Sequence, residues 1–270
     1  MAVSEKPSFL ASLLAGGMAG TSVDVALFPL DTIKTRLQSS EGFFKAGGFR
    51  GVYNGLSAAA IGSAPGAALF FSSYETAKHA MDPNSPASHM AAASVAETVA
   101  CLVRVPTENV KQKMQAGLHK SAAATVTSIL KTSGPLGFYS GYLTTVMREI
   151  PFSFIQFPIY EALKAKWASR RGSRLESYEA AACGSVSGAI AAGVTTPIDV
   201  VKTRIMLGKA RYHGVDYRGL IHTFRRVYTE EGAAALMSGV VPRVTWISIG
   251  GFVFFGVYEA SKAQIMSWGV

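Results

Sequence analysis

The chain has 270 residues, of which 49% are hydrophobic and only 16% are charged, and its 26 lysines and arginines outnumber its 17 acidic residues. An ordinary soluble domain has about 25% charged residues, so this composition argues against a water-soluble protein and favours a polytopic membrane protein with basic loops. Disordered, collagen-like and disulfide-stapled chains are excluded. Cys101 and Cys183 lie within apolar segments, so we expect reduced packing residues and no metal site.

Six apolar stretches have about the 20 residues that are needed to cross a hydrocarbon core of about 30 Å. They predict transmembrane helices at 9–30, 56–75, 88–106, 142–161, 178–198 and 243–259. Two amphipathic segments, 121–132 and 219–230, predict short helices at the membrane surface. The long connections share one side, and their excess of lysine and arginine predicts the negatively charged side of the membrane; these connections are 31–55, 107–141 and 199–242.

Two motifs recur three times in alternation along the chain. The first ends each odd-numbered stretch and reads proline, any residue, acid, two residues, base: PLDTIKTR (29–36), PTENVKQK (106–113) and PIDVVKTR (197–204). The second ends each even-numbered stretch and reads tyrosine, acid, two residues, base: YETAK (74–78), YEALK (160–164) and YEASK (258–262). Local i,i+3 ion pairs would explain any one copy, but not the shared phase of all six with the apolar pattern.

This repetition predicts an all-α membrane protein built from three tandem two-helix repeats with pseudo-threefold symmetry. The repeats cover approximately 8–80, 87–168 and 177–266, and residues 1–270 form a single transport domain. In such a bundle the acid of one copy can reach the base of another, so we expect a ring of ion pairs at each end.

The ring next to the long connections, the loop-side ring, is expected to pair Asp31 with Lys111, Glu108 with Lys202, and Asp199 with Lys34. The terminus-side ring at the other end would contain Glu75, Lys78, Glu161, Lys164, Glu259 and Lys262. An exposed ion pair contributes only about 0.2–1 kcal/mol, so either ring is weak enough to open. Closing one ring at a time predicts alternating access to a central site.

The triplicate PxDxxKxR and YExxK motifs resemble those of the mitochondrial carrier family, over about residues 8–266. The resemblance implies a monomeric, multi-pass transporter of the mitochondrial inner membrane, surrounded by membrane lipids, and not an enzyme. The loop-side ring is then the matrix gate, braced by Gln38 and Gln115, with Met206 in the third brace position. The terminus-side ring is the cytoplasmic gate, and its braces are Tyr74, Tyr160 and Tyr258.

Three glycine-led segments, GGFRGVYNG, SGPLGFYSG and EGAAALMSG, resemble the family's cardiolipin sites, where backbone N–H groups at a helix start favour phosphate. The resemblance therefore implies that cardiolipin can bind at these segments. It implies no cofactor.

Charged residues inside apolar stretches cost about 2.5–3.5 kcal/mol each, so those that persist are candidates for function. Asp24 and Glu97 precede acids of the loop-side ring by about two and three turns, which predicts that they face the same central cavity. The surplus negative charge of these acids suggests a substrate with a second positive centre.

In the family, a position on the fourth helix contacts the substrate, and here it reads Arg148-Glu149, which is similar to carriers of amino-acid-like substrates. Arg148 can bind a carboxylate bidentately, and Glu149 can accept hydrogen bonds from an ammonium group. Phe152 and Trp246 are candidates for stacking on an aromatic base. Packing or lipid contact would explain both aromatic residues equally well.

Several segments, including VDVALFPLDTIKTRLQS and REIPFSFIQFPIYE, resemble those of family members that carry S-adenosylmethionine. This implies exchange of cytosolic S-adenosylmethionine for matrix S-adenosylhomocysteine. A carrier for basic amino acids, or for another cationic amino-acid-like metabolite, would use the same acidic and basic residues, and a proton-dissipating uncoupler is a further alternative within the family.

Two alternatives come from other classes of protein. Against a membrane enzyme, the five histidines show no metal-ligand spacing, and no GxSxG, P-loop or strand-linked GxGxxG motif is present. Against a nucleic-acid scaffold, the basic residues are spread among loops rather than gathered in one aromatic-interleaved patch. We therefore expect no nucleic-acid partner.

Overall fold

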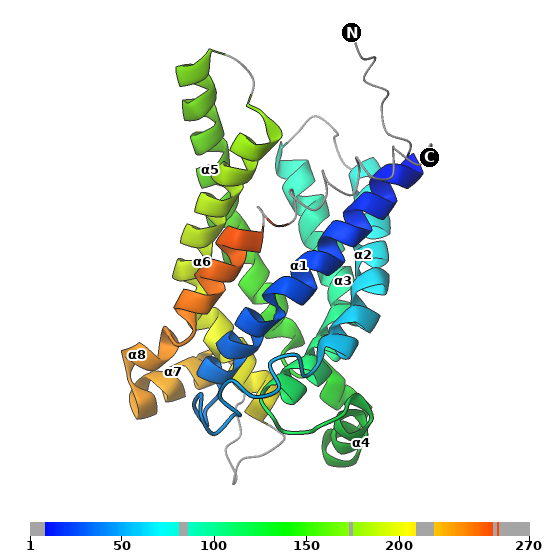
Figure 1. Cartoon of the computed structure of the whole chain (residues 1–270), viewed down its shortest axis with the longest axis vertical. Helices are drawn as coiled ribbons and strands as arrows, with labels where there is room; N and C mark the ends of the chain where they lie inside the picture. The colour runs from blue at the N-terminus through cyan, green and yellow to red at the C-terminus, as the bar shows by residue number, and fades with distance from the viewer. Residues whose placement is uncertain (1–8, 81–85, 173–174, 209–218, 251–252, 254–270) are drawn as a thin grey trace.

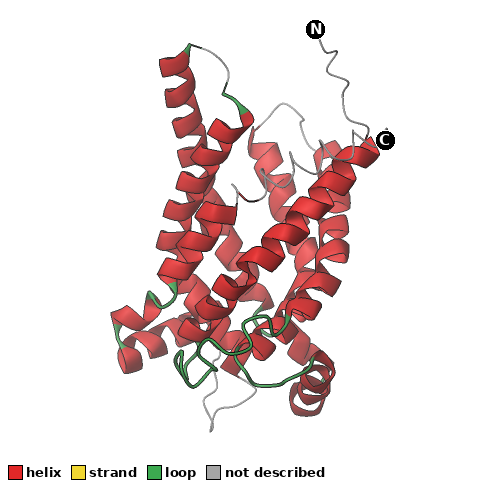
Figure 2. Cartoon of the chain, viewed as in Figure 1, coloured by secondary structure: helices red, strands yellow, loops and turns green. Residues whose placement is uncertain are grey.

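The computed structural model describes residues 9–80, 86–172, 175–208, 219–250 and 253. Over these ranges the chain consists of helices joined by turns and contains no strand (Figure 2). The prediction of an all-helical protein is therefore confirmed for the described residues.

Five of the predicted apolar stretches lie within long helices of the described ranges: α1 (Phe9–Gln38), α2 (Leu56–His79), α3 (Pro86–Gln115), α5 (Tyr142–Arg171) and α6 (Ser177–Gly208). The odd-numbered stretches were predicted to end near Pro29, Pro106 and Pro197, but α1, α3 and α6 continue through these prolines and include the whole charged motif. A helix at 240–250 contains the start of the sixth stretch, 243–259. The rest of that stretch lies outside the described residues, except residue 253.

Three helical stretches among the described residues are long and apolar enough to cross a membrane by length and composition: Leu56–His79, Tyr178–Gly208 and Ala233–Gly250. The longer helices α3 and α5 contain charged residues such as Glu97, Arg104 and Arg148. These charges lower the mean hydropathy of α3 and α5.

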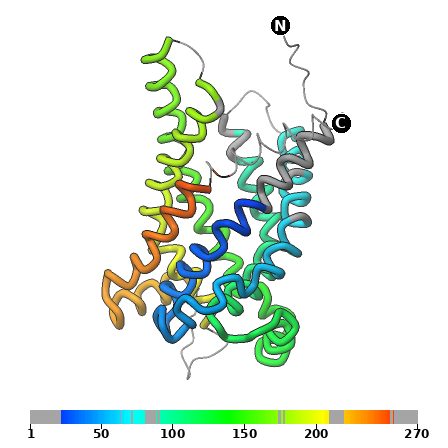
Figure 3. The backbone as a smooth tube through the Cα atoms, in the orientation of Figure 1, coloured from blue at the N-terminus to red at the C-terminus, as the bar shows by residue number. Residues whose placement is uncertain are grey.

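The short helices gather at one end of the bundle, which we call the loop end (Figures 1 and 3). They are α4 (Ala122–Ser133), the 3-10 helix η1 (Pro135–Tyr139), α7 (Gly219–Glu231) and α8 (Ala233–Leu236). The predicted surface helices at 121–132 and 219–230 are thus present as α4 and α7. Ser121 is the N-cap of α4, and its hydroxyl accepts a hydrogen bond from the Ala124 N–H at 3.2 Å.

The apolar faces of α4 and α7 pack onto the ends of the long helices. Ile129 of α4 belongs to a buried cluster with Val110 and Met114 of α3. Val227 of α7 packs in the same way with Val201 of α6. The burial of one stripe of each short helix explains their amphipathic sequence.

The first repeat has turns at 41–55 where the other two repeats have a surface helix. The buried side chain of Arg36 holds this segment, because its guanidinium donates to the carbonyl oxygens of Gly48 at 2.5 Å and Gly51 at 3.2 Å. Gly47 has a φ of 114°, and a Cβ there would lie 3.2 Å from the Arg36 guanidinium carbon. The turn therefore needs glycine for both its backbone angle and its space.

Candidate functional site

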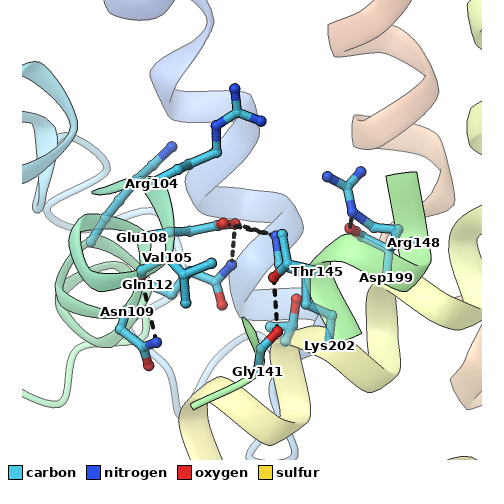
Figure 4. A network of polar contacts seen from close by, with 12 residues as sticks. Arg104, Val105, Glu108, Asn109, Gln112, Gly141, Thr145, Arg148, Asp199 and Lys202 are labelled. Atoms are coloured by element: carbon cyan, nitrogen blue, oxygen red, sulfur yellow. Dashed lines mark hydrogen bonds and ion pairs between the residues drawn. The ribbon is translucent and has the colours of Figure 1, made fainter. Parts of the chain in front are cut away.

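Helices α1, α3 and α6 contact one another, and their charged motifs form three ion pairs at the loop end. Each pair joins two different helices at a nitrogen-to-oxygen distance of 2.7 Å: Lys111 with Asp31, Lys202 with Glu108, and Lys34 with Asp199. Figure 4 shows Lys202 reaching Glu108 across the gap between α6 and α3. The three pairings are those that the repeat predicted.

The loop-side ring is shielded from water to different degrees around its circumference. The side chains of Asp199 and Lys202 are only 3% exposed, whereas those of Asp31 and Lys111 are 22% and 23% exposed. Because shielding from solvent strengthens an ion pair, the ring can hold this end of the bundle closed.

Glutamine side chains brace two of the three pairs. The amide nitrogen of Gln115 donates to Asp31 at 2.9 Å, and that of Gln38 donates to Asp199 at 2.9 Å. Both glutamines are fully buried, and each reaches an acid on another helix. Their positions agree with the brace positions that the family resemblance implies.

The last base of the repeated motif forms a second threefold set of contacts, which we call the basic ring, and to which the sequence analysis assigned no role. Each of these bases is buried and donates to the backbone carbonyl at the brace position of another helix: Arg36 to Gln115, Lys113 to Met206, and Arg204 to Gln38. The signal was present in the motif, because all three copies carry a base two residues after the ring lysine.

Arg148, a predicted substrate contact, lies beside the loop-side ring. It forms an ion pair with Glu149, and its Nε atom is 3.6 Å from a carboxylate oxygen of Asp199 (Figure 4). Glu97 interacts electrostatically with both Arg148 and Glu149. The structure thus brings together three of the predicted substrate contacts from α3 and α5.

Asp24, the fourth charged candidate, lies on α1 close enough to Lys111 and Asp31 of the loop-side ring to interact with them electrostatically. It is exposed. Its placement agrees with the expectation that it shares a helix face with Asp31.

Two arginines that the sequence analysis left unassigned change the charge of this region. Arg104 forms an ion pair with Glu97. Arg243 is 4% exposed, and its guanidinium lies 3.2 Å from Asp199 and donates to the Thr195 hydroxyl at 2.9 Å. These two arginines therefore offset part of the expected surplus of negative charge among the described residues. Among the described acids outside the ring, Glu97 pairs with Arg104 and Glu149 pairs with Arg148.

A cavity of about 510 Å³ lies between α2, α3 and α5, within the size range of small-molecule sites. Glu97 and Glu149 contribute charge to its lining, and Phe70, Phe154 and Phe157 contribute aromatic rings. The predicted aromatic contacts Phe152 and Trp246 are both half-buried, and Phe152 is not among the described residues that line this cavity. Their role as stacking partners stays a prediction.

The terminus-side ring is only partly within the described residues, because Tyr258, Glu259 and Lys262 lie outside them. Lys164 pairs at 3.2 Å with Glu161 on the same helix, and its ammonium lies 4.7 Å from the centre of the Tyr160 ring. Glu75 is exposed and Lys78 is half-buried. Among these four described charges, no ion pair joins α2 to α5.

Tyr74, the predicted brace of the terminus-side ring in the first repeat, stacks on Phe70 with ring centres 6.2 Å apart. The cross-helix terminus-side ring and its tyrosine braces therefore stay predictions.

Comparison with known proteins identifies the family. The profile of the mitochondrial carrier protein family matches residues 5–46, 41–85, 82–171 and 173–267. The mitochondrial S-adenosylmethionine carrier proteins of Mus musculus and Danio rerio are each 50% identical to this chain, over 270 and 267 residues respectively, covering 98% and 97% of it and 98% and 100% of the relative. The S-adenosylmethionine mitochondrial carrier protein homolog of Drosophila melanogaster is 49% identical over 262 residues, covering 94% of this chain and 92% of its own. The chain therefore belongs to the mitochondrial carrier family and is a multi-pass transporter of the mitochondrial inner membrane.

Proposed function

We propose that this chain exchanges cytosolic S-adenosylmethionine for matrix S-adenosylhomocysteine by alternating access. The observation that carries the substrate assignment is the identity of about half of all residues, over nearly the whole chain, to relatives named as S-adenosylmethionine carriers. The Arg148–Glu149 pair supports it, because it supplies one group for a carboxylate and one for an ammonium at the same place.

The architecture that we propose is a six-helix bundle of three tandem repeats with pseudo-threefold symmetry, in which 243–259 is the sixth membrane helix. The cyclic contacts at the loop end support this arrangement. Helix α1 pairs with α3, α3 with α6, and α6 with α1. The basic ring repeats the same cycle.

The acid–arginine pairs of the central region suit the proposed pair of substrates. S-adenosylmethionine carries a carboxylate, an ammonium and a sulfonium, whereas S-adenosylhomocysteine lacks the sulfonium charge. A strongly negative cavity would hold the cation too firmly and the neutral product too weakly. In the proposed site Arg148 binds the carboxylate, Glu149 binds the ammonium, and Glu97 and Asp24 face the sulfonium.

The loop-side ring is proposed as the matrix gate, in agreement with the excess of basic residues in the long connections. With that ring closed, the binding site is reached from the cytoplasmic side. Substrate bound at Arg148 competes with Asp199 for this guanidinium, which lies between the site and the ring. Binding and opening of the matrix gate are coupled in this way.

Cardiolipin is proposed as a lipid bound at the loop end by the monomeric carrier. Helices α2 and α5 both begin after a left-handed glycine, Gly55 and Gly141, that provides no side-chain cap. Their first backbone N–H groups therefore lack a capping side chain and suit a phosphate.

Exchange in proteoliposomes tests the function directly. Purified protein in liposomes loaded with S-adenosylhomocysteine should take up labelled S-adenosylmethionine, and empty liposomes should not. Arg148→Gln should abolish this uptake, whereas Arg170→Gln, a change of an exposed arginine at the far end of α5, should leave it intact. Complete competition by ornithine or arginine would instead indicate a carrier of basic amino acids.

A further inference from the structure

The three acids of the loop-side ring are stabilised by amides in two different ways. In the first and third repeats a threonine stands four residues after the acid and holds the brace that comes from another helix. The Thr35 hydroxyl donates to the amide oxygen of Gln115 at 3.0 Å, and the Thr203 hydroxyl donates to that of Gln38 at 2.7 Å. Thus two side chains from different helices cooperate at each of these acids.

The second repeat has a different residue type at both the threonine position and the brace position. Gln112 occupies the position of the threonines, and Met206 occupies the position of the glutamine braces. The amide nitrogen of Gln112 donates directly to Glu108 at 2.9 Å. The same carboxylate accepts from Lys202 at 2.7 and 2.8 Å (Figure 4). Glu108 therefore has an amide donor although the usual brace position holds a thioether.

Met206 fills space at this joint and provides no amide donor. It is completely buried and packs on α3 with Val105 and Cys101, about one and two turns before Glu108. Its side chain also lies against the start of α5, where a Cβ at Gly141 would come within 2.9 Å of it. A glutamine at 206 would therefore point toward the region that Gln112 now serves.

We propose that Gln112 is the brace of the Glu108–Lys202 pair and performs from within α3 the task that Gln115 and Gln38 perform between helices. This inference rests on the proposed gating function of the ring. A brace within one helix stabilises the acid but does not tie α3 to α6. The polar bonds between α3 and α6 then come from the ring lysine and from Lys113, beside the packing of Met206 on α3.

The positions of the remaining side-chain bonds support this asymmetry among the described residues. Between α1 and α3, the Gln115 amide bonds Asp31, Thr32 and Thr35 in addition to the ion pair. Between α3 and α6, the ion pair is joined by the bond from Lys113 to the Met206 carbonyl. Within the described part of the chain, the amide oxygen of Gln112 is buried without a hydrogen-bond partner, whereas the amide oxygens of Gln115 and Gln38 each accept from a threonine.

Transplanting the arrangement of the other repeats tests the proposal. The reporter is Ser153→Cys, which lines the cavity, labelled in inverted membrane vesicles by an impermeant thiol reagent that reaches only the loop end. Gln112→Thr should raise the labelling rate about tenfold or more, because a hydrogen bond to a charged group is lost. Adding Met206→Gln should return the rate to within about twofold of the parent, since the pair then matches the residues of the first and third repeats.

The controls separate a brace from a packing effect. Met206→Leu added to Gln112→Thr preserves volume but offers no donor, so it should leave the labelling high. Gln115→Ala should raise labelling in the parent. If Gln115→Ala raises labelling and Gln112→Thr does not, the role of Gln112 is overturned. If neither variant changes labelling while the parent exchanges substrate in liposomes, the gating role of the ring and this inference fail together, whereas the transport function stands.

Folding of each variant is checked by thermal unfolding. If Gln112→Thr alone does not fold, the double variant decides: labelling at the parent's rate supports the inference, and raised labelling overturns it.

Discussion

The two ends of the molecule use the same pair of residue types, an acid and a base three residues apart, with different results. At the loop end the acids and bases of α1, α3 and α6 pair between helices. At the opposite end the described pair, Glu161 with Lys164, stays within α5. Spacing along one helix therefore does not decide whether a charge pairs locally or across the bundle; the distance between helix ends does. This difference is what a carrier closed at one end requires.

The largest expected effect comes from Asp199→Asn, which removes the acid that serves Lys34, Arg148 and Arg243. Leaving buried charges unpaired costs about 3–5 kcal/mol, so the loop end should lose its closed state. Exchange should fall more than about a hundredfold, and thermal unfolding should occur at a lower temperature. Normal exchange by a folded Asp199→Asn protein would contradict a closed ring centred on this residue.

Reversing one pair gives a smaller and recoverable effect. Lys111→Asp places two acids together and should reduce exchange about tenfold or more, in line with a loss of at least 1.4 kcal/mol. Combining it with Asp31→Lys restores opposite charges at these positions and should recover much of the loss. A double variant no better than Lys111→Asp alone would show that these residues do not act as a pair.

Membrane potential tests whether the proposed exchange moves net charge. Exchange of the cation S-adenosylmethionine for neutral S-adenosylhomocysteine moves one charge, worth about 2.3 kcal/mol per 100 mV. Uptake into liposomes with a negative interior, set with valinomycin and a potassium gradient, should be several times faster than at zero potential. Equal rates at both potentials would indicate that a second ion moves with the substrate.

The smallest expected effect is that of Glu161→Gln at the opposite end. Its carboxylate is 66% exposed, and an exposed i,i+3 pair contributes about 0.5 kcal/mol or less. The unfolding temperature of Glu161→Gln should change little while the loop end is closed. Asp199→Asn also replaces a carboxylate by an amide, but it should lower the unfolding temperature. A comparable loss of stability in both variants would remove the difference between the two ends.

The helices and the three loop-end pairings could be predicted because the same apolar stretch and the same charged motif occur in each of the three repeats. The apolar stretches gave the existence of each helix but placed the odd-numbered ends near the prolines, and α1, α3 and α6 run on to Gln38, Gln115 and Gly208. A charged segment reads as a loop when only hydropathy is considered. Packing at the loop end keeps it helical.

The partners of isolated charges could not be predicted in the same way. Arg243 has no counterpart in a repeated motif, and its contact with Asp199 brings residues distant in sequence together. Arg104 lies two turns from Glu97 on the same helix, a spacing that places both side chains on one face. Local periodicity specifies which face a side chain shares, whereas the partner of an isolated charge depends on which helices face each other.

Arg204 connects the ring helix α6 to the membrane surface. Its guanidinium holds both carboxylate oxygens of Glu231 at the end of α7, at 2.7 and 2.8 Å, while its Nε atom donates to the Gln38 carbonyl of α1. Helix α7 therefore moves with α6 whenever the α1–α6 contact loosens. In the proposed alternating-access cycle, this amphipathic helix therefore shifts together with α6 when the loop end opens, which couples the cycle to the lipid layer that its apolar face is suited to.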